Sequence, residues 1–94
     1  MLVGVPKEIK SGEARVGLTP GAVGEYVARG HRVLVETGAG AGIDAGDEAY
    51  LRAGAEIAGT AAAVFAKADM IVKVKEPQPQ EWAQLHAGQI LFTY

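Results

Sequence analysis

Five short runs rich in β-branched and other apolar residues alternate along the chain with segments that carry helix signals. Consecutive runs are separated by connections long enough for crossovers, which favours a parallel sheet. Crossovers between parallel strands are right-handed in nearly all known folds. We therefore predict strands over Leu2–Val5, Arg32–Glu36, Ala55–Ala58, Met70–Val74 and Gln89–Tyr94.

The connections contain the helices that such a sheet needs. Thr19 and Pro20 are typical of an N-cap and a first helical position, and apolar residues then recur at helical spacing up to Gly30. Further helices are predicted over Asp47–Ala53, Thr60–Lys67 and Glu81–Leu85, with Trp82 as the anchor of the last. The predicted fold class is α/β: a flavodoxin-like, parallel, five-stranded sheet with helices on both faces.

The length of 94 residues is enough for one domain with one hydrophobic core. The fifth predicted strand, which we interpret as a core strand, runs to Tyr94 and is not followed by a helix. We therefore expect residues 1–94 to be part of a domain, with further chain in the parent protein.

Composition and charge exclude several function classes. With 9 basic and 11 acidic residues spread along the chain, there is no basic stripe for nucleic acid or an anionic membrane. The chain has no cysteine, which rules out disulfides, thiolate metal sites and thiol nucleophiles. It has no apolar stretch of about 20 residues. We expect a cytoplasmic protein that binds no metal and no nucleic acid.

The predicted strand Met70–Val74 delivers lysines to its own carboxyl end, shortly before Pro77. Period-2 geometry puts Ile71, Lys73 and Lys75 on one face of the strand. Ligands of open parallel sheets bind outside the carboxyl ends of the strands. Lys75 is therefore a candidate site residue. The alternative is that both lysines cap the strand and stay solvated, since lysine is rarely buried unless it is paired.

Two other polar side chains are expected at the same edge of the sheet. Arg15 lies in the aperiodic segment that follows the first strand, and Tyr94 ends the fifth strand. Tyr94 could equally belong to the core, because aromatic residues at strand ends often do. His31 and His86 lie beside turns and are interpreted as surface residues rather than catalytic ones.

A glycine-rich segment, Thr37–Gly42, directly follows the second predicted strand. A dinucleotide-binding fingerprint requires G-x-G-x-x-G between a strand and a helix. Here the sixth position is Ile43, and no long amphipathic helix begins there. We interpret the segment as a glycine-rich turn and expect this chain to bind no cofactor.

Three stretches together resemble the N-terminal domain shared by alanine dehydrogenase and the α subunit of NAD(P) transhydrogenase. The resemblance spans the whole chain, and its motifs are specific in combination. One position departs from the family pattern, because Ala14 precedes the arginine where family members often have asparagine. The stretches are Gly4–Lys10 with Glu13–Val16, Val33–Gly40, and Val72–Pro77 with Ile90–Tyr94.

The resemblance implies roles for two residues. An arginine and a lysine in these motifs hold the carboxylate and the oxo or amino group of the substrate, which correspond to Arg15 and Lys75. The Lys75-Glu76-Pro77 motif looks like the alanine dehydrogenase branch. The family's catalytic histidine, catalytic aspartate and Rossmann fingerprint come after the last residue of this chain. NAD would thus be bound by another domain of the parent protein, which is expected to be a homo-oligomer.

The residue types suit this chemistry. The planar fork of Arg15 can pair with a carboxylate through two parallel hydrogen bonds. Lys75 can donate to a 2-oxo oxygen and stabilise the charge that develops there. A Schiff base at Lys75 would need a strongly lowered pKa, whereas the neighbouring Glu76 would raise it.

The leading hypothesis is the substrate-binding lobe of an NAD-dependent alanine dehydrogenase, which interconverts L-alanine with pyruvate and ammonia. The 94-residue chain alone is expected to be inactive. Alternatives are the corresponding lobe of a transhydrogenase α subunit, a freestanding interaction module with this fold, and a truncation product without activity. A receiver-like phospho-acceptor would need an acidic cluster where this chain has Lys73 and Lys75.

Overall fold

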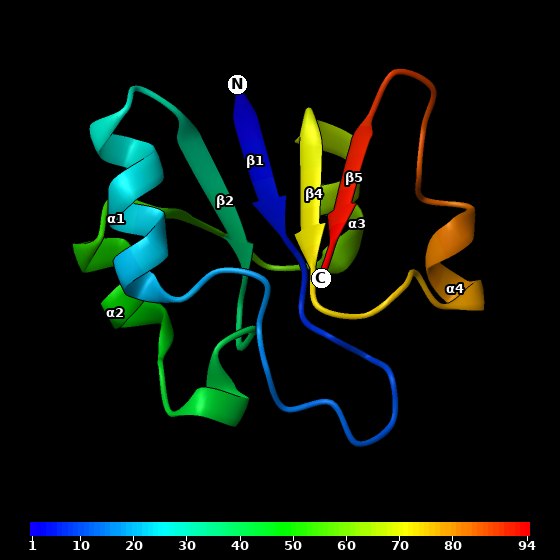
Figure 1. The fold of residues 1–94 in the computed structure, drawn as a ribbon, viewed down its shortest axis with the longest axis horizontal. Coiled ribbons are helices and arrows are strands. Elements are labelled where there is room, and N and C mark those ends of the chain that lie inside the picture. The colour runs from blue at the N-terminus through cyan, green and yellow to red at the C-terminus, as the bar shows by residue number, and fades with distance from the viewer.

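The computed structural model describes all residues from Met1 to Tyr94 and contains one parallel sheet of five strands (Figure 1). All five strands run in the same direction, so their carboxyl ends form one edge. The strand order is β3-β2-β1-β4-β5. The strands are β1 (Leu2–Val5), β2 (Arg32–Glu36), β3 (Glu56–Ala58), β4 (Met70–Lys73) and β5 (Ile90–Thr93).

Helices cover both faces of the sheet, as predicted. Helices α1 (Pro20–Ala28) and α2 (Asp47–Arg52) pack together on one face, and α3 (Ala61–Lys67) packs on the other face against β1, β2 and β3 (Figure 1). The predicted caps are confirmed, because the Thr19 side chain accepts from the Ala22 N–H and the Thr60 side chain from the Ala63 N–H, both at 3.2 Å. A 3₁₀ turn, η1 (Ala41–Ile43), and the short helix α4 (Pro79–Trp82) complete the fold.

The strand order corrects one part of the predicted architecture. The parallel five-stranded α/β sheet is confirmed, but its order is 3-2-1-4-5 rather than the 2-1-3-4-5 order of flavodoxin. The chain moves from β1 to β2 to β3 in one direction, and α3 then carries it back across the other face to β4. Local patterns do not encode this direction, because right-handed crossovers can be built either way across a sheet.

The core consists of two clusters, one on each face. Alternating side chains of the central strands divide between them, so that Val33 and Val35 face α1 and α2 while Leu34 faces α3. Gly4 allows α3 to approach β1 closely, since a Cβ at this position would lie 2.6 Å from the Ala68 side chain.

Two predictions about the C-terminal quarter are wrong. Trp82 does not anchor α4 in the core, because the residue is 63% exposed and only its indole N–H is bound, to the Pro77 carbonyl; Glu81 is the buried residue of that helix. The fifth strand is not a core strand but an edge strand whose residues are all exposed, since no helix covers it. In this region, apolar residues are exposed and a glutamate is buried, so residue type alone did not predict burial.

No helix has the length and apolar character needed to span a membrane.

Candidate active site

The candidate site lies where the strand order reverses, at the carboxyl ends of the neighbouring strands β1 and β4. Ligands of open α/β sheets bind in the crevice at such a switch point. β1 and β4 pair only as far as Gly4 and Ile71, so their carboxyl ends are not joined by the ladder. The loop after β1, residues 6–19, passes below these ends, and the segment after β4 turns away beside it (Figure 1).

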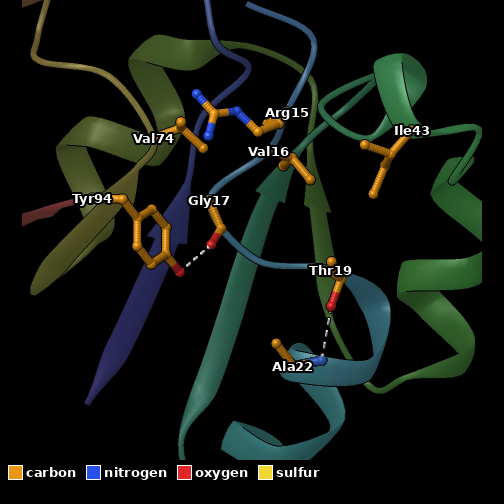
Figure 2. A pocket seen from close by; sticks show the side chains of 8 residues that line it. All are labelled: Arg15, Val16, Gly17, Thr19, Ala22, Ile43, Val74 and Tyr94. Carbon is orange, nitrogen blue, oxygen red and sulfur yellow. Dashed lines mark hydrogen bonds between the residues drawn. The ribbon is translucent and has the colours of Figure 1, made fainter.

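The path of the β1 loop depends on Gly17. This residue lies against the backbone of β4, where any Cβ would collide with the Val72 carbonyl oxygen. The Tyr94 hydroxyl donates a hydrogen bond of 2.7 Å to the Gly17 carbonyl, and the neighbouring Val16 and Leu18 are buried (Figure 2). The loop that carries Arg15 is therefore held against the sheet.

Arg15 is held by Glu13, a residue to which the sequence analysis assigned no role. The Arg15 Nε and Nη2 atoms donate to the two Glu13 carboxylate oxygens at 3.0 and 2.9 Å, and the Arg15 backbone N–H donates to one of them at 2.8 Å. The hydrogen bonds from Arg15 lower the pKa of Glu13 to about 2, so this carboxyl stays ionised. The Arg15 side chain is 65% exposed. Because a guanidinium has five N–H groups, the Nη1 edge remains free for a ligand.

Arg15 and Lys75 line the same polar hollow, as the sequence analysis predicted from their positions at one edge. The hollow contains three cationic side chains and one carboxylate, so it favours an anion. Its lining consists of Lys10, Ser11, Gly12, Glu13, Ala14, Arg15 and Lys75.

The lysines at this edge differ in their partners. Lys10 forms an ion pair of 2.7 Å with Glu76, which is therefore not the partner of Lys75. The Lys75 side chain is half-buried and its ammonium has no acidic partner, while its backbone N–H donates to Glu8 at 3.2 Å. Among these lysines, only Lys75 combines a place in the hollow with an ammonium that is not paired.

Lys73 is not a solvated strand cap, which corrects that alternative for one of the two lysines. It is 1% exposed, and its ammonium lies between two buried carboxylates, Glu8 at 3.1 Å and Glu81 at 3.4 Å. We call Glu8, Lys73 and Glu81 the buried triad. The only sequence signal for it was the position of Lys73 on the same strand face as Ile71, at a point where burial would require partners.

Tyr94 lies beside a second, mostly apolar hollow that Arg15 also borders. The Tyr94 residue is 69% exposed, so it does not belong to the core, and its ring contacts Phe92 edge-on at 5.6 Å between centroids. Figure 2 shows Arg15, Val16 and Gly17 running between Val74 and Tyr94 on one side and Ile43 on the other. The lining consists of Arg15, Val16, Gly17, Thr19, Ala22, Ile43, Val74 and Tyr94.

The glycine-rich segment packs closely against neighbouring parts of the chain. A Cβ at Gly40 would collide with the Ala45 carbonyl oxygen, and one at Gly42 would collide with the Ala14 carbonyl oxygen. Both glycines therefore allow the turn to pack closely against other segments of the backbone. Asp47 accepts from the Thr37 hydroxyl and from the Gly38 N–H, which ties the turn to the start of α2.

The histidines lie apart from the polar hollow. His31 precedes β2 at the opposite, amino-terminal edge of the sheet and packs edge-on against Tyr26, at 6.2 Å between centroids. His86 is exposed in the connection between α4 and β5.

Comparisons with known proteins agree on one family. Residues 4–94 match the family described as "Alanine dehydrogenase/PNT, N-terminal domain". Alanine dehydrogenase from Methanococcus maripaludis is 55% identical over 94 residues, which is 100% of this chain and 25% of that protein. A solved L-alanine dehydrogenase superposes with a TM-score of 0.96 at 47% identity, covering 100% of this chain and 26% of that one.

A solved transhydrogenase from Sinorhizobium meliloti also superposes, with a TM-score of 0.92 at 35% identity, covering 99% of this chain and 26% of that one. The chain therefore spans about a quarter of the length of the relatives it matches.

Proposed function

This chain belongs to the alanine dehydrogenase/PNT N-terminal domain family, and on that premise we propose that it is the substrate-binding lobe of an NAD-dependent alanine dehydrogenase. The observation that carries the proposal is the polar hollow at the β1/β4 switch point, which Arg15 and Lys75 line together. A small 2-oxo acid such as pyruvate has a carboxylate and a carbonyl oxygen on adjacent carbons. The two cationic side chains match these two groups in chemistry.

Arg15 binds and orients the substrate carboxylate. Glu13 occupies the Nε side of the guanidinium, so the substrate carboxylate pairs with the Nη1 side. Each charge-assisted hydrogen bond of this kind contributes about 1.5–3 kcal/mol. Because Glu13 fixes the guanidinium before the substrate arrives, less side-chain entropy is lost on binding.

Lys75 acts on the other end of the substrate. Its unpaired ammonium donates to the 2-oxo oxygen, polarises the carbonyl and stabilises negative charge that develops on that oxygen. Tyr94 has a supporting role, since its hydroxyl is already bonded to the Gly17 carbonyl and holds the Arg15 loop in place.

NAD supplies or accepts the hydride in the proposed reaction. Since the glycine-rich segment lacks the G-x-G-x-x-G fingerprint, we assign NAD binding to a part of the parent protein outside this chain. The 94-residue chain alone is then expected to turn over neither alanine nor pyruvate.

A dehydrogenase role is favoured over a transhydrogenase role by sequence. The alanine dehydrogenase from M. maripaludis is 55% identical to this chain, whereas the solved transhydrogenase is 35% identical. Lys75-Glu76-Pro77 also follows the pattern that resembles the alanine dehydrogenase branch.

The test is to assay the full-length parent protein for two reactions. We expect oxidation of NADH that depends on both pyruvate and ammonium, and reduction of NAD that depends on L-alanine. Hydride exchange between NADH and an NADP analogue, without any need for pyruvate or alanine, would contradict the proposal and support the transhydrogenase alternative.

A further inference from the structure

The buried triad is connected to Lys75, which lines the polar hollow, through a hydrogen bond from the Lys75 backbone N–H to Glu8. Glu8 comes from the loop after β1, Lys73 is the last residue of β4, and Glu81 comes from α4. The three side chains are 2%, 1% and 3% exposed. A buried ion pair is often no more stabilising than an apolar replacement of the same size, so stability alone does not explain why charged groups occupy this place.

The Glu8 carboxylate makes contacts that the Glu81 carboxylate does not. One Glu8 oxygen accepts from the Lys73 ammonium at 3.1 Å and from the Lys75 N–H at 3.2 Å, and the other accepts from the Val74 N–H at 3.0 Å. These two N–H groups lie past the end of β4, where no neighbouring strand continues the ladder. Glu81 instead accepts from the Gln78 N–H at 2.9 Å, within its own helix turn.

The Glu8 carboxylate therefore bridges the two strands at the point where their pairing has stopped. β1 and β4 are paired through Gly4 and Ile71 and then separate. A side chain from the loop after β1 takes over as acceptor for the backbone after β4. This fixes the segment that carries Lys75 at the hollow that Arg15 also lines.

We propose that Glu8, held by Lys73, is a positioning residue for Lys75: it fixes the Val74–Lys75 backbone so that the Lys75 ammonium faces the substrate. This inference rests on the proposed function of Lys75. Glu8 does not touch the substrate, and Glu81 pairs with Lys73 and caps its own helix but contacts neither the Val74 nor the Lys75 backbone. The two buried carboxylates thus have different functions despite sharing one ammonium.

The chain offers a matched pair of variants, Glu8→Gln and Glu81→Gln, to be made in the full-length parent protein. Each removes one negative charge and leaves one neutral pair between Lys73 and the remaining carboxylate. Folding should survive both changes, because neither leaves an unpaired buried charge. A glutamine side chain has one acceptor oxygen and one donor nitrogen, so in Glu8→Gln it cannot accept at both of the positions where the Glu8 carboxylate does. Melting temperatures of both variants control for stability.

The first readout is turnover. We expect Glu8→Gln to lower kcat/KM for pyruvate by about tenfold to a hundredfold, the size of effect caused by a misplaced catalytic group. Glu81→Gln should remain close to the wild type. In a Lys75→Ala background, adding Glu8→Gln should lower kcat/KM further by less than about threefold. The effects of two residues that act through one another are not additive. Equal losses in Glu8→Gln and Glu81→Gln, or full additivity with Lys75→Ala, would overturn the proposal.

The second readout does not need activity. Hydrogen exchange should be about tenfold faster or more in Glu8→Gln at the Val74 amide, the Lys75 amide or both, because one glutamine oxygen cannot replace both carboxylate oxygens. Exchange at both amides should be unchanged in Glu81→Gln. Unchanged exchange in Glu8→Gln would overturn the proposal whatever the kinetics. If the wild type showed no alanine-dependent turnover, the proposed function would fail, and the exchange data would still decide whether Glu8 holds this backbone.

Should Glu8→Gln fail to fold, Glu8→Asp can be used for the same two readouts. This variant keeps both carboxylate oxygens but withdraws them by one methylene.

Discussion

The guanidinium of Arg15 has two sides, and Glu13 occupies only one of them. This arrangement makes the fork geometry, and not only the positive charge, necessary for substrate binding. A lysine at the same position would offer a single ammonium to both Glu13 and the substrate. At the scale of single residues, substrate binding therefore depends on which Arg15 atoms are already bonded to Glu13.

Replacing Arg15 with lysine should weaken substrate binding by about tenfold to a hundredfold, since each 1.4 kcal/mol corresponds to a factor of ten. The measurement is KM for pyruvate in the full-length parent protein. Arg32→Lys is the matched control, because Arg32 makes a similar two-bond pair with Glu56 away from the hollow. An unchanged KM in Arg15→Lys would mean that Arg15 does not bind the substrate.

Glu13 should make the chain more sensitive to acid. Its pKa is lowered from 4.5 to about 2, chiefly by the side-chain hydrogen bond from Arg15. A carboxyl with a lowered folded-state pKa stabilises the fold above its ordinary pKa, and this contribution is lost as the pH falls through the folded-state value. The loss should therefore occur between pH 4.5 and about 2.

The measurement is the free energy of unfolding of this chain at pH 5 and at pH 2.5. Asp47, Glu56 and Glu76 also have lowered pKa values, each mainly through a side-chain hydrogen bond, so the wild type will lose stability for several reasons. We expect Glu13→Gln to lose less than the wild type over this interval. Equal losses in the two proteins would contradict the assignment.

At the scale of elements, the glycine-rich turn after β2 is a packing element. Gly42 has no positive φ, but a Cβ there would collide with the Ala14 carbonyl oxygen, one residue before Arg15. Gly24, in the interior of α1, has open space around its Cβ position. Replacing Gly42 and Gly24 with alanine is therefore expected to have opposite effects on stability.

We expect Gly42→Ala to destabilise the chain by about 1–3 kcal/mol, as forced overpacking does. Gly24→Ala should stabilise it by about 0.5–1 kcal/mol, because alanine restricts the unfolded chain. Both values come from denaturant unfolding. In the parent protein, Gly42→Ala should not raise KM for NAD selectively, and a selective rise would indicate that the turn contacts the nucleotide after all.

Local patterns in the sequence predicted most elements, and contacts between distant segments account for the errors. Thr19 and Thr60 act as helix caps because capping depends on residues a few positions apart. Glu8 and Lys73 are 65 positions apart, so neither residue alone indicated the pair. Trp82 was predicted to be buried from its residue type, but α4 lies beside the exposed edge strand and packs through Glu81 instead.

The sequence predicted part of the candidate site but not all of it. The carboxyl-end rule for parallel sheets placed Arg15 and Lys75 at one edge, and the structure brings them to one hollow. The role of Glu13 was missed, although the Glu-x-Arg spacing was visible in the sequence, because a two-residue spacing in a loop does not determine whether the side chains meet.

At the scale of the whole molecule, the doubly wound topology explains why the two cationic side chains meet. β1 and β4 are neighbours only because α3 returns the chain across the opposite face of the sheet. Residues near the start and the end of the chain thereby share one crevice, which no single element could build. The central claim is that Lys75, on the β4 side of that crevice, acts on the substrate.

The most direct test is steady-state kinetics of Lys75→Ala in the full-length parent protein, in both reaction directions and with melting curves. We predict that kcat and kcat/KM fall by roughly a hundredfold or more, as when one oxyanion donor is removed, while the melting temperature is unchanged. Lys10→Ala, which removes a lysine of the same hollow that is already paired with Glu76, should leave kcat near the wild-type value. An intact kcat in Lys75→Ala, or an unfolded domain, would show that Lys75 is only a strand cap.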